Sequence, residues 1–169
     1  MNDVYKEQMV KQAPTVKDRL LQCGSLFLAA VILYLAMMFA SQFFVFALAA
    51  VGFGVYYLFG FLSREYEYIL TNGDLDVDCI YGKSRRKRIF SGELKSFDMM
   101  AHVDDMGYES VFKNAVVRKD CSDGKPSANT YKFSAPYKGK QTFILFTPND
   151  EMLRLMMPYL GQRRLAMKK

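Results

Sequence analysis

The residues in this chain best suited to bind a ligand form one basic cluster. Five cationic side chains lie close together, and they are Lys83, Arg85, Arg86, Lys87 and Arg88. Cations at this density bind phosphate oxygens through charge-assisted hydrogen bonds. One interpretation is contact with anionic lipid headgroups, which contributes about 1 kcal/mol for each Lys or Arg near a membrane surface. A protein ligand is a second interpretation, and a solvated hairpin whose charges pair with an acidic strand is a third.

Three alternating carboxylates, Asp74, Asp76 and Asp78, raise the question of a calcium site. An EF-hand loop needs Gly at its sixth position and a bidentate Glu at its twelfth. Counted from Asp74, those positions hold Cys79 and Arg85. The pattern instead predicts three carboxylates on the exposed face of one strand, available to pair across strands with the basic cluster. We therefore expect no metal site.

No constellation of residues indicates catalysis. The only histidine, His102, lies near Asp104 in a segment that reads as a surface loop, so acid–base chemistry is disfavoured. The cysteines are scattered, odd in number and without a CxxC pair, which is typical of a reduced compartment; they are Cys23, Cys79 and Cys121. We predict that the protein is not an enzyme and has no cofactor.

The elements that must position the basic cluster begin with a long uncharged stretch. No Asp, Glu, Lys, Arg or His occurs in residues 20–63. A helix needs about 20 apolar residues to cross a bilayer, so this stretch fits two crossings. Ser41-Gln42 is the best break, giving spans 20–40 and 43–62. The first run is longer than the h-region of a secretory signal, and no small-x-small site follows it, which favours an uncleaved anchor.

Charge around the two spans predicts their orientation. Lys and Arg lie on both flanks and are missing from the short loop, so the positive-inside rule places both termini in the cytoplasm. The prediction is a multi-pass protein of the cell membrane whose first partner is the lipid bilayer. A net charge of +6 beside such spans is explained by orientation and anionic headgroups, without a nucleic acid partner.

Small residues recur at helix-face spacing within the spans. Ser25 and Ala29 share one side of the first span, and Ala47, Ala50 and Gly54 recur in the second. Small side chains let helix backbones approach closely. They indicate either packing of the hairpin on itself or packing on a membrane-protein partner or second copy. No charged group lies in the spans, which argues against an ion path.

Residues 64–162 change to the alternating pattern of a small soluble domain. Strands are expected near residues 66–71, 74–81, 86–90, 94–100, 115–119, 130–135 and 141–146. Asn72-Gly73 is a hairpin turn signal, because both residues tolerate positive φ. A final amphipathic helix should begin with Thr147 as its N-cap and kink or end at Pro158. Residues 1–19 read as a polar N-terminal arm and 163–169 as a basic tail.

About seven antiparallel strands followed by a helix resemble the pleckstrin-homology (PH)-like architecture, an α+β, mostly-β fold. The resemblance to bacterial PH-like domains lies in Tyr66-Glu67-Tyr68, the Asn72-Gly73 turn, Leu75-Asp76-Val77 and the basic run before Ile89. The start of the chain, the hairpin, and the segments 65–68 and 82–88 also resemble a family of small two-span membrane proteins of Gram-positive bacteria. The resemblance implies a fold and a location, and brings no activity with it.

Two functions follow as expectations. The first is a membrane-anchored, non-catalytic interaction or scaffold module, with a cytoplasmic PH-like domain at the inner leaflet and the basic hairpin facing anionic lipid or a protein. The alternative is an accessory subunit of a membrane transport or secretion complex.

Overall fold

The structure, a computed structural model, describes residues 3–105, 115–125 and 129–160. The chain divides into two compact units. Residues 14–64 and 81–85 form one, and residues 1–13, 65–80 and 86–169 form the other. The predicted basic tail lies outside the described residues.

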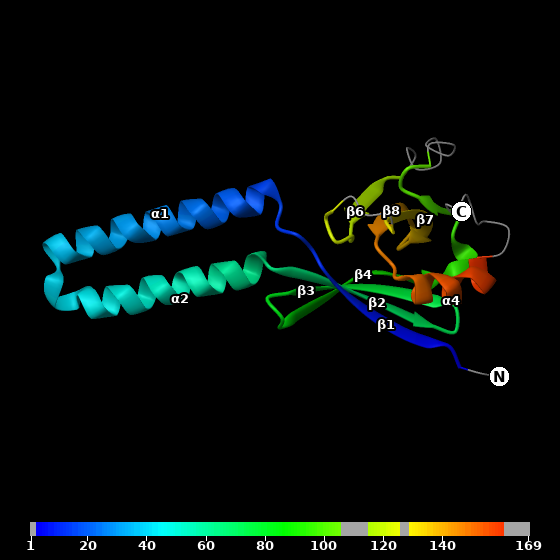
Figure 1. The fold of residues 1–169 in the computed structure, drawn as a ribbon, viewed down its shortest axis with the longest axis horizontal. Coiled ribbons are helices and arrows are strands. Elements are labelled where there is room, and N and C mark those ends of the chain that lie inside the picture. Colours follow the sequence, from blue (N-terminus) through cyan, green and yellow to red (C-terminus); the bar gives the residue numbers. More distant parts are fainter. Residues whose placement is uncertain (1–2, 106–114, 126–128, 161–169) are drawn as a thin grey trace. The chain divides into compact units, whose positions relative to one another are not determined.

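The first unit is a hairpin of two helices that lie side by side (Figure 1). They are α1 (Val16–Phe39) and α2 (Phe44–Leu62), joined by a 3₁₀ turn at Ser41–Phe43. The predicted break, Ser41-Gln42, lies within this turn. Both helices are long and apolar enough to cross a membrane, and almost none of their residues is buried within the protein.

Helix α1 begins earlier than the uncharged stretch because a capping box starts it. The backbone N–H of Asp18 donates to Thr15 Oγ1 (3.2 Å), and the N–H of Thr15 donates to Asp18 Oδ2 (2.9 Å). Asp18 also lies 4.0 Å from Arg64, which follows α2. One buried carboxylate thus caps α1 and links the two ends of the hairpin.

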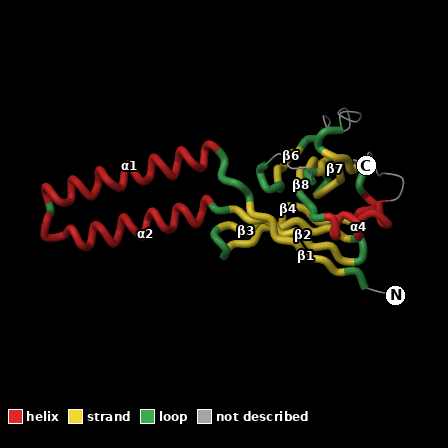
Figure 2. The backbone as a smooth tube through the Cα atoms, in the orientation of Figure 1, coloured by secondary structure: helices red, strands yellow, loops and turns green. Residues whose placement is uncertain are grey.

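The second unit contains two four-stranded sheets, shown as strands in Figure 2. The first has the order β1-β2-β3-β4, and its strands are β1 (Tyr5–Lys11), β2 (Arg64–Thr71), β3 (Asp74–Tyr81) and β4 (Arg85–Glu93). The second has the order β5-β7-β8-β6, and its strands are β5 (Met99–His102), β6 (Val117–Asp120), β7 (Tyr131–Tyr137) and β8 (Lys140–Phe146). The seven predicted strands correspond to β2–β8, which confirms the fold class.

Three details differ from the sequence prediction. The N-terminal arm is not a loose lead, because Tyr5–Lys11 forms β1 and pairs antiparallel with β2 over its whole length. Strand β6 pairs parallel with β8, whereas β7 pairs antiparallel with it. Residues Leu94–Ser96 form a 3₁₀ turn before β5 instead of the start of a strand.

An aromatic cluster fills the core of this unit. The rings of Phe97 and Phe133 stack with centroids 4.4 Å apart, and Phe90 and Phe146 contact Phe133 edge-on. Aromatic contacts of this kind add about 0.5–1.5 kcal/mol each beyond the burial of area. Cys79 is buried in the same unit.

Helix α4 (Asp150–Leu160) packs its buried Met152 and Met156 onto the unit. Its N-cap is Asn149 and not Thr147, because Asn149 Oδ1 accepts the N–H of Met152 (2.8 Å). Pro158 lies inside the helix, which continues past it through Leu160.

The side-chain amide of Gln8 joins α4 to the first sheet. It accepts the N–H of Asn149 (2.8 Å) and donates to the carbonyl of Thr147 (2.9 Å). Strand β1 therefore supports both the edge of the sheet and the start of the helix.

Candidate functional site

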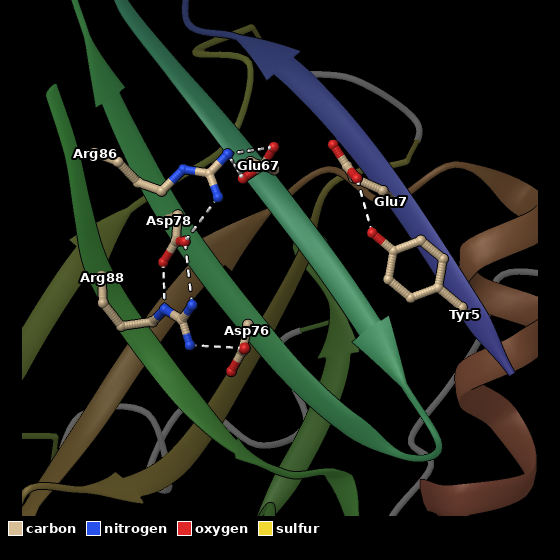
Figure 3. A network of polar contacts seen from close by, with 7 residues as sticks. All are labelled: Tyr5, Glu7, Glu67, Asp76, Asp78, Arg86 and Arg88. Carbon is tan, nitrogen blue, oxygen red and sulfur yellow. Dashed lines mark hydrogen bonds and ion pairs between the residues drawn. The ribbon is translucent and has the colours of Figure 1, made fainter. Parts of the chain in front are cut away.

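The structure divides the basic cluster into two groups. Arg86 and Arg88 turn toward carboxylates on other strands of the same sheet, as Figure 3 shows. Lys83, Arg85 and Lys87 are exposed, and among the described residues they have no ion-pair partner. Within the cluster, an external anion could therefore bind these three cations without displacing a carboxylate of the described residues.

Arg86 and Arg88 bridge three strands of the first sheet (Figure 3). Arg86 Nη2 lies 3.0 Å from Oε1 and 2.7 Å from Oε2 of Glu67 on β2. Arg88 Nη1 lies 2.7 Å from Asp76 Oδ2, and its Nη2 lies 3.3 Å from Asp78 Oδ2, both on β3. Arg88 Nε also donates to Asp78 Oδ1. We call these five side chains the arginine–carboxylate network.

The network compensates charges that are otherwise costly. Glu67 and Asp78 are only 2% and 1% exposed, although the prediction placed all three aspartates on an exposed face. An uncompensated buried carboxylate is strongly destabilising. The predicted pairing between the aspartates and the basic cluster is confirmed for Asp76 and Asp78, while burial of Asp78 corrects the expectation of a solvent-exposed face.

The pKa values within this network reflect burial and neighbouring groups. Burial raises the pKa of Glu67, and so does the adjacent Glu7 side chain, while Arg86 acts in the opposite direction. Glu7 on β1 accepts a hydrogen bond from the hydroxyl of Tyr5 (2.9 Å), which lowers the pKa of Glu7. Hydrogen bonding to Asp78 raises the pKa of Arg88. The arrangement stabilises a charged sheet face and leaves its two arginines occupied.

The turn that carries Lys83 and Arg85 is held against the end of α2, within the hairpin unit. The N–H of Gly82 donates to the carbonyl of Ser63 (3.1 Å). The ring of Tyr81 stacks on that of Phe61, with centroids 6.3 Å apart. Gly82 has a φ of +56°, and a Cβ there would lie 3.0 Å from the Gly60 carbonyl oxygen. This close approach requires glycine.

A half-open cavity of about 180 Å³ lies beside this turn. Its lining combines aromatic side chains and backbone of α2 with polar groups of the turn, and its residues are Tyr56, Tyr57, Gly60, Phe61, Tyr81, Gly82, Ser84 and Arg85. Arg85 and Ser84 can bind phosphate oxygens, and tyrosine hydroxyls can donate to them. Lys83 and Lys87 are not part of the lining.

The small residues predicted for helix packing separate into two groups. Ser25 and Ala29 of α1 line a shallow apolar hollow together with Gly54 of α2. Ala47 is half-buried, and Ala50 is exposed. Ser25, Ala29 and Gly54 therefore lie around one hollow, and Ala47 and Ala50 do not line it.

The histidine and the cysteines were the remaining candidates for reactive groups, and their surroundings do not indicate chemistry. His102 lies on β5 and is buried against Tyr131, which corrects its expected place in a surface loop. Its Nδ1 accepts the N–H of Asp104 (3.3 Å). Burial raises the pKa of the Cys121 thiol to about 12, so that thiol is not a reactive thiolate at neutral pH. Cys23 is exposed on α1.

The sequence patterns do not identify Glu67, Tyr56 and Tyr57 as neighbours of the basic cluster. Glu67 was recognised only as part of an aromatic strand motif, although its alternation with Tyr66 and Tyr68 places it on the aspartate face. Tyr56 and Tyr57 lie in the second apolar run, and no sequence pattern links them to the basic cluster. That link depends on a turn docking onto a helix end, which no local pattern encodes.

Comparison with known proteins agrees with this architecture. The chain matches the family described as Bacterial PH-like domain (DUF6106) over residues 2–165, which includes the helices as well as both sheets. No curated protein and no solved structure matches it significantly. Because the match covers nearly the whole chain, the protein belongs to the bacterial PH-like domain (DUF6106) family.

Proposed function

We propose that this protein is a two-span membrane anchor that carries a non-catalytic PH-like interaction module, with the turn at residues 81–85 in contact with anionic headgroups. The observation that carries the proposal is the docking of this turn on the exit end of α2, through Gly82, Ser63 and the Phe61–Tyr81 stack. Lys83 and Arg85 would then lie at the depth of lipid phosphates, where cations are favoured.

The connection of the two units supports a common side for both chain ends. Strand β1 ends where α1 is about to begin, β2 begins just after α2, and Lys11 pairs with Glu65 in the sheet. Paired strands must lie on the same side of a bilayer. If both helices cross, the two ends of the hairpin emerge together, and the flanking Lys and Arg favour the cytoplasmic side.

Orientation can be tested with one reporter cysteine. Lys140→Cys places a thiol at an exposed position, and a Cys23→Ser background removes the exposed native thiol. In cells producing the full chain, a membrane-impermeant maleimide should label this cysteine only after lysis. Carbonate washing should leave the protein in the membrane fraction. Labelling of intact cells, or release by carbonate, would contradict the anchor and its orientation.

Headgroup contact can be tested by hydrogen exchange in nanodiscs. Exchange of residues 82–88 should be slower in discs containing phosphatidylglycerol than in phosphatidylcholine discs. High salt should remove the difference, because it screens exposed charges. The triple variant Lys83→Gln, Arg85→Gln and Lys87→Gln should also remove it. The β7–β8 turn serves as an internal reference, and equal exchange of residues 82–88 in both lipids would overturn the contact.

A further inference from the structure

We propose that the cavity beside the 81–85 turn is a discrete site for the headgroup of one anionic phospholipid, with its phosphate at Arg85 and Ser84. This inference rests on the proposed membrane function and goes beyond it. Diffuse attraction needs only cations near a surface, whereas a site requires particular side chains around a hollow.

The chemistry of the lining selects a phosphate. Arg85 is exposed, and its planar guanidinium can bind two phosphate oxygens at once. Ser84 and the hydroxyls of Tyr56 and Tyr57 add neutral donors around the same cavity. The Gly60 carbonyl, which would repel an anion at this helix end, already accepts the N–H of Ser63 (3.2 Å).

The size and position of the cavity select a lipid over a soluble phosphate. Its volume of about 180 Å³ lies below the roughly 300–1,000 Å³ of pockets that enclose a drug-sized ligand, so it fits a headgroup and not a whole lipid. Phe61 and Tyr57 are 53% and 58% exposed on α2, where acyl chains can cover them. Lys83 and Arg85 disfavour a headgroup that carries its own cation, such as choline.

Two matched pairs of variants distinguish a site from diffuse attraction. Arg85→Gln and Lys87→Gln remove the same charge, but only Arg85 lines the cavity. Gly60→Leu and Gly52→Leu add the same side chain to α2, and both glycines have open space where a Cβ would lie. Only Gly60 lines the cavity, so only Gly60→Leu should fill it.

The experiment is a titration of the full-length protein in detergent with phosphatidylglycerol. Native mass spectrometry counts the bound lipids, and every variant is measured over the same range of lipid concentrations. We expect one saturable lipid per chain, with phosphatidylcholine binding more weakly. Arg85→Gln should weaken binding about tenfold, the effect of losing roughly 1.4 kcal/mol of charge-assisted hydrogen bonding. Gly60→Leu should do the same, while Lys87→Gln and Gly52→Leu should stay within about twofold of the wild type.

The outcomes separate the site from the proposed function. Equal weakening by Arg85→Gln and Lys87→Gln, or no loss with Gly60→Leu, would overturn the site while the lipid-dependent exchange of residues 82–88 could still stand. Competition by millimolar glycerol 3-phosphate would overturn the choice of a lipid. If hydrogen exchange of residues 82–88 in the wild-type protein were the same in both kinds of nanodisc, the proposed headgroup contact itself would be overturned.

Discussion

The basic cluster contains two groups of cations that differ in whether the fold supplies carboxylate partners. Arg86 and Arg88 form the first group, and Lys83, Arg85 and Lys87 form the second. The first two contact carboxylates of β2 and β3, of which Glu67 and Asp78 are buried, whereas the other three have no ion-pair partner among the described residues. A run of cations in a sequence therefore overstates the charge available to a ligand. The strand that carries the run points alternate side chains to opposite sides of the sheet. The cations on one side therefore pair with carboxylates and stabilise the fold.

Arg88→Gln should have the largest effect on stability. It leaves Asp78, which is 1% exposed, without its main cationic partner. We expect a loss of about 1.5–3 kcal/mol in the free energy of unfolding, the range for hydrogen bonds to charged groups. Chemical denaturation of the full chain in detergent, followed by the near-ultraviolet circular dichroism of its tyrosines, measures this. Lys87→Gln is the matched control, and equal losses from both variants would erase the distinction between the two groups.

Glu67→Gln should change how stability depends on pH. The raised pKa of Glu67 means that its stabilising contribution is complete below the unfolded value of 4.5 and is lost as pH rises through the folded pKa. The glutamine variant lacks this loss, so its stability relative to the wild type should improve as pH increases. Thermal unfolding of both proteins between pH 4 and pH 8 measures the trend.

Glu7→Gln provides the opposite slope as a control. The lowered pKa of Glu7 gives a contribution that is present above the unfolded value and is lost as pH falls through the folded pKa. The Glu7 variant should therefore lose stability relative to the wild type as pH increases. Parallel slopes for the two variants would show that burial of Glu67 does not govern its ionisation.

Replacing all three exposed cations should have the smallest effect on folding. The Lys83→Gln, Arg85→Gln and Lys87→Gln variant removes no ion pair described in the structure, and exposed substitutions usually change stability by less than about 0.5 kcal/mol each. The same denaturation assay tests this. A loss as large as that of Arg88→Gln would mean that these cations also serve the fold.

The sequence alone predicts much of this molecule because many of its signals are local. A stretch without charges indicates two spans, and Asn72-Gly73 marks a turn that the structure confirms with φ values of +49° and +94°. Alternation identifies the positions of β2–β8. These features depend on residues close together in the chain, so short-range periodicity is enough to find them.

Strand β1 cannot be predicted from local patterns of this kind. Its residues are mostly polar, and its partner β2 lies beyond the entire helical hairpin. The sheet edge and Gln8 hold it in place, and neither is visible in the local pattern. The same is true of His102, whose burial depends on strand β7.

The sequence by itself determined the apolar hairpin, the order of seven strands and the presence of a dense basic cluster. Only the tertiary structure decided which of those cations are available. It brought Glu67, Asp76 and Asp78 to Arg86 and Arg88, and it docked the 81–85 turn on the end of α2. The reason is physical: charge is a property of each residue, but its compensation depends on neighbours that the fold brings together.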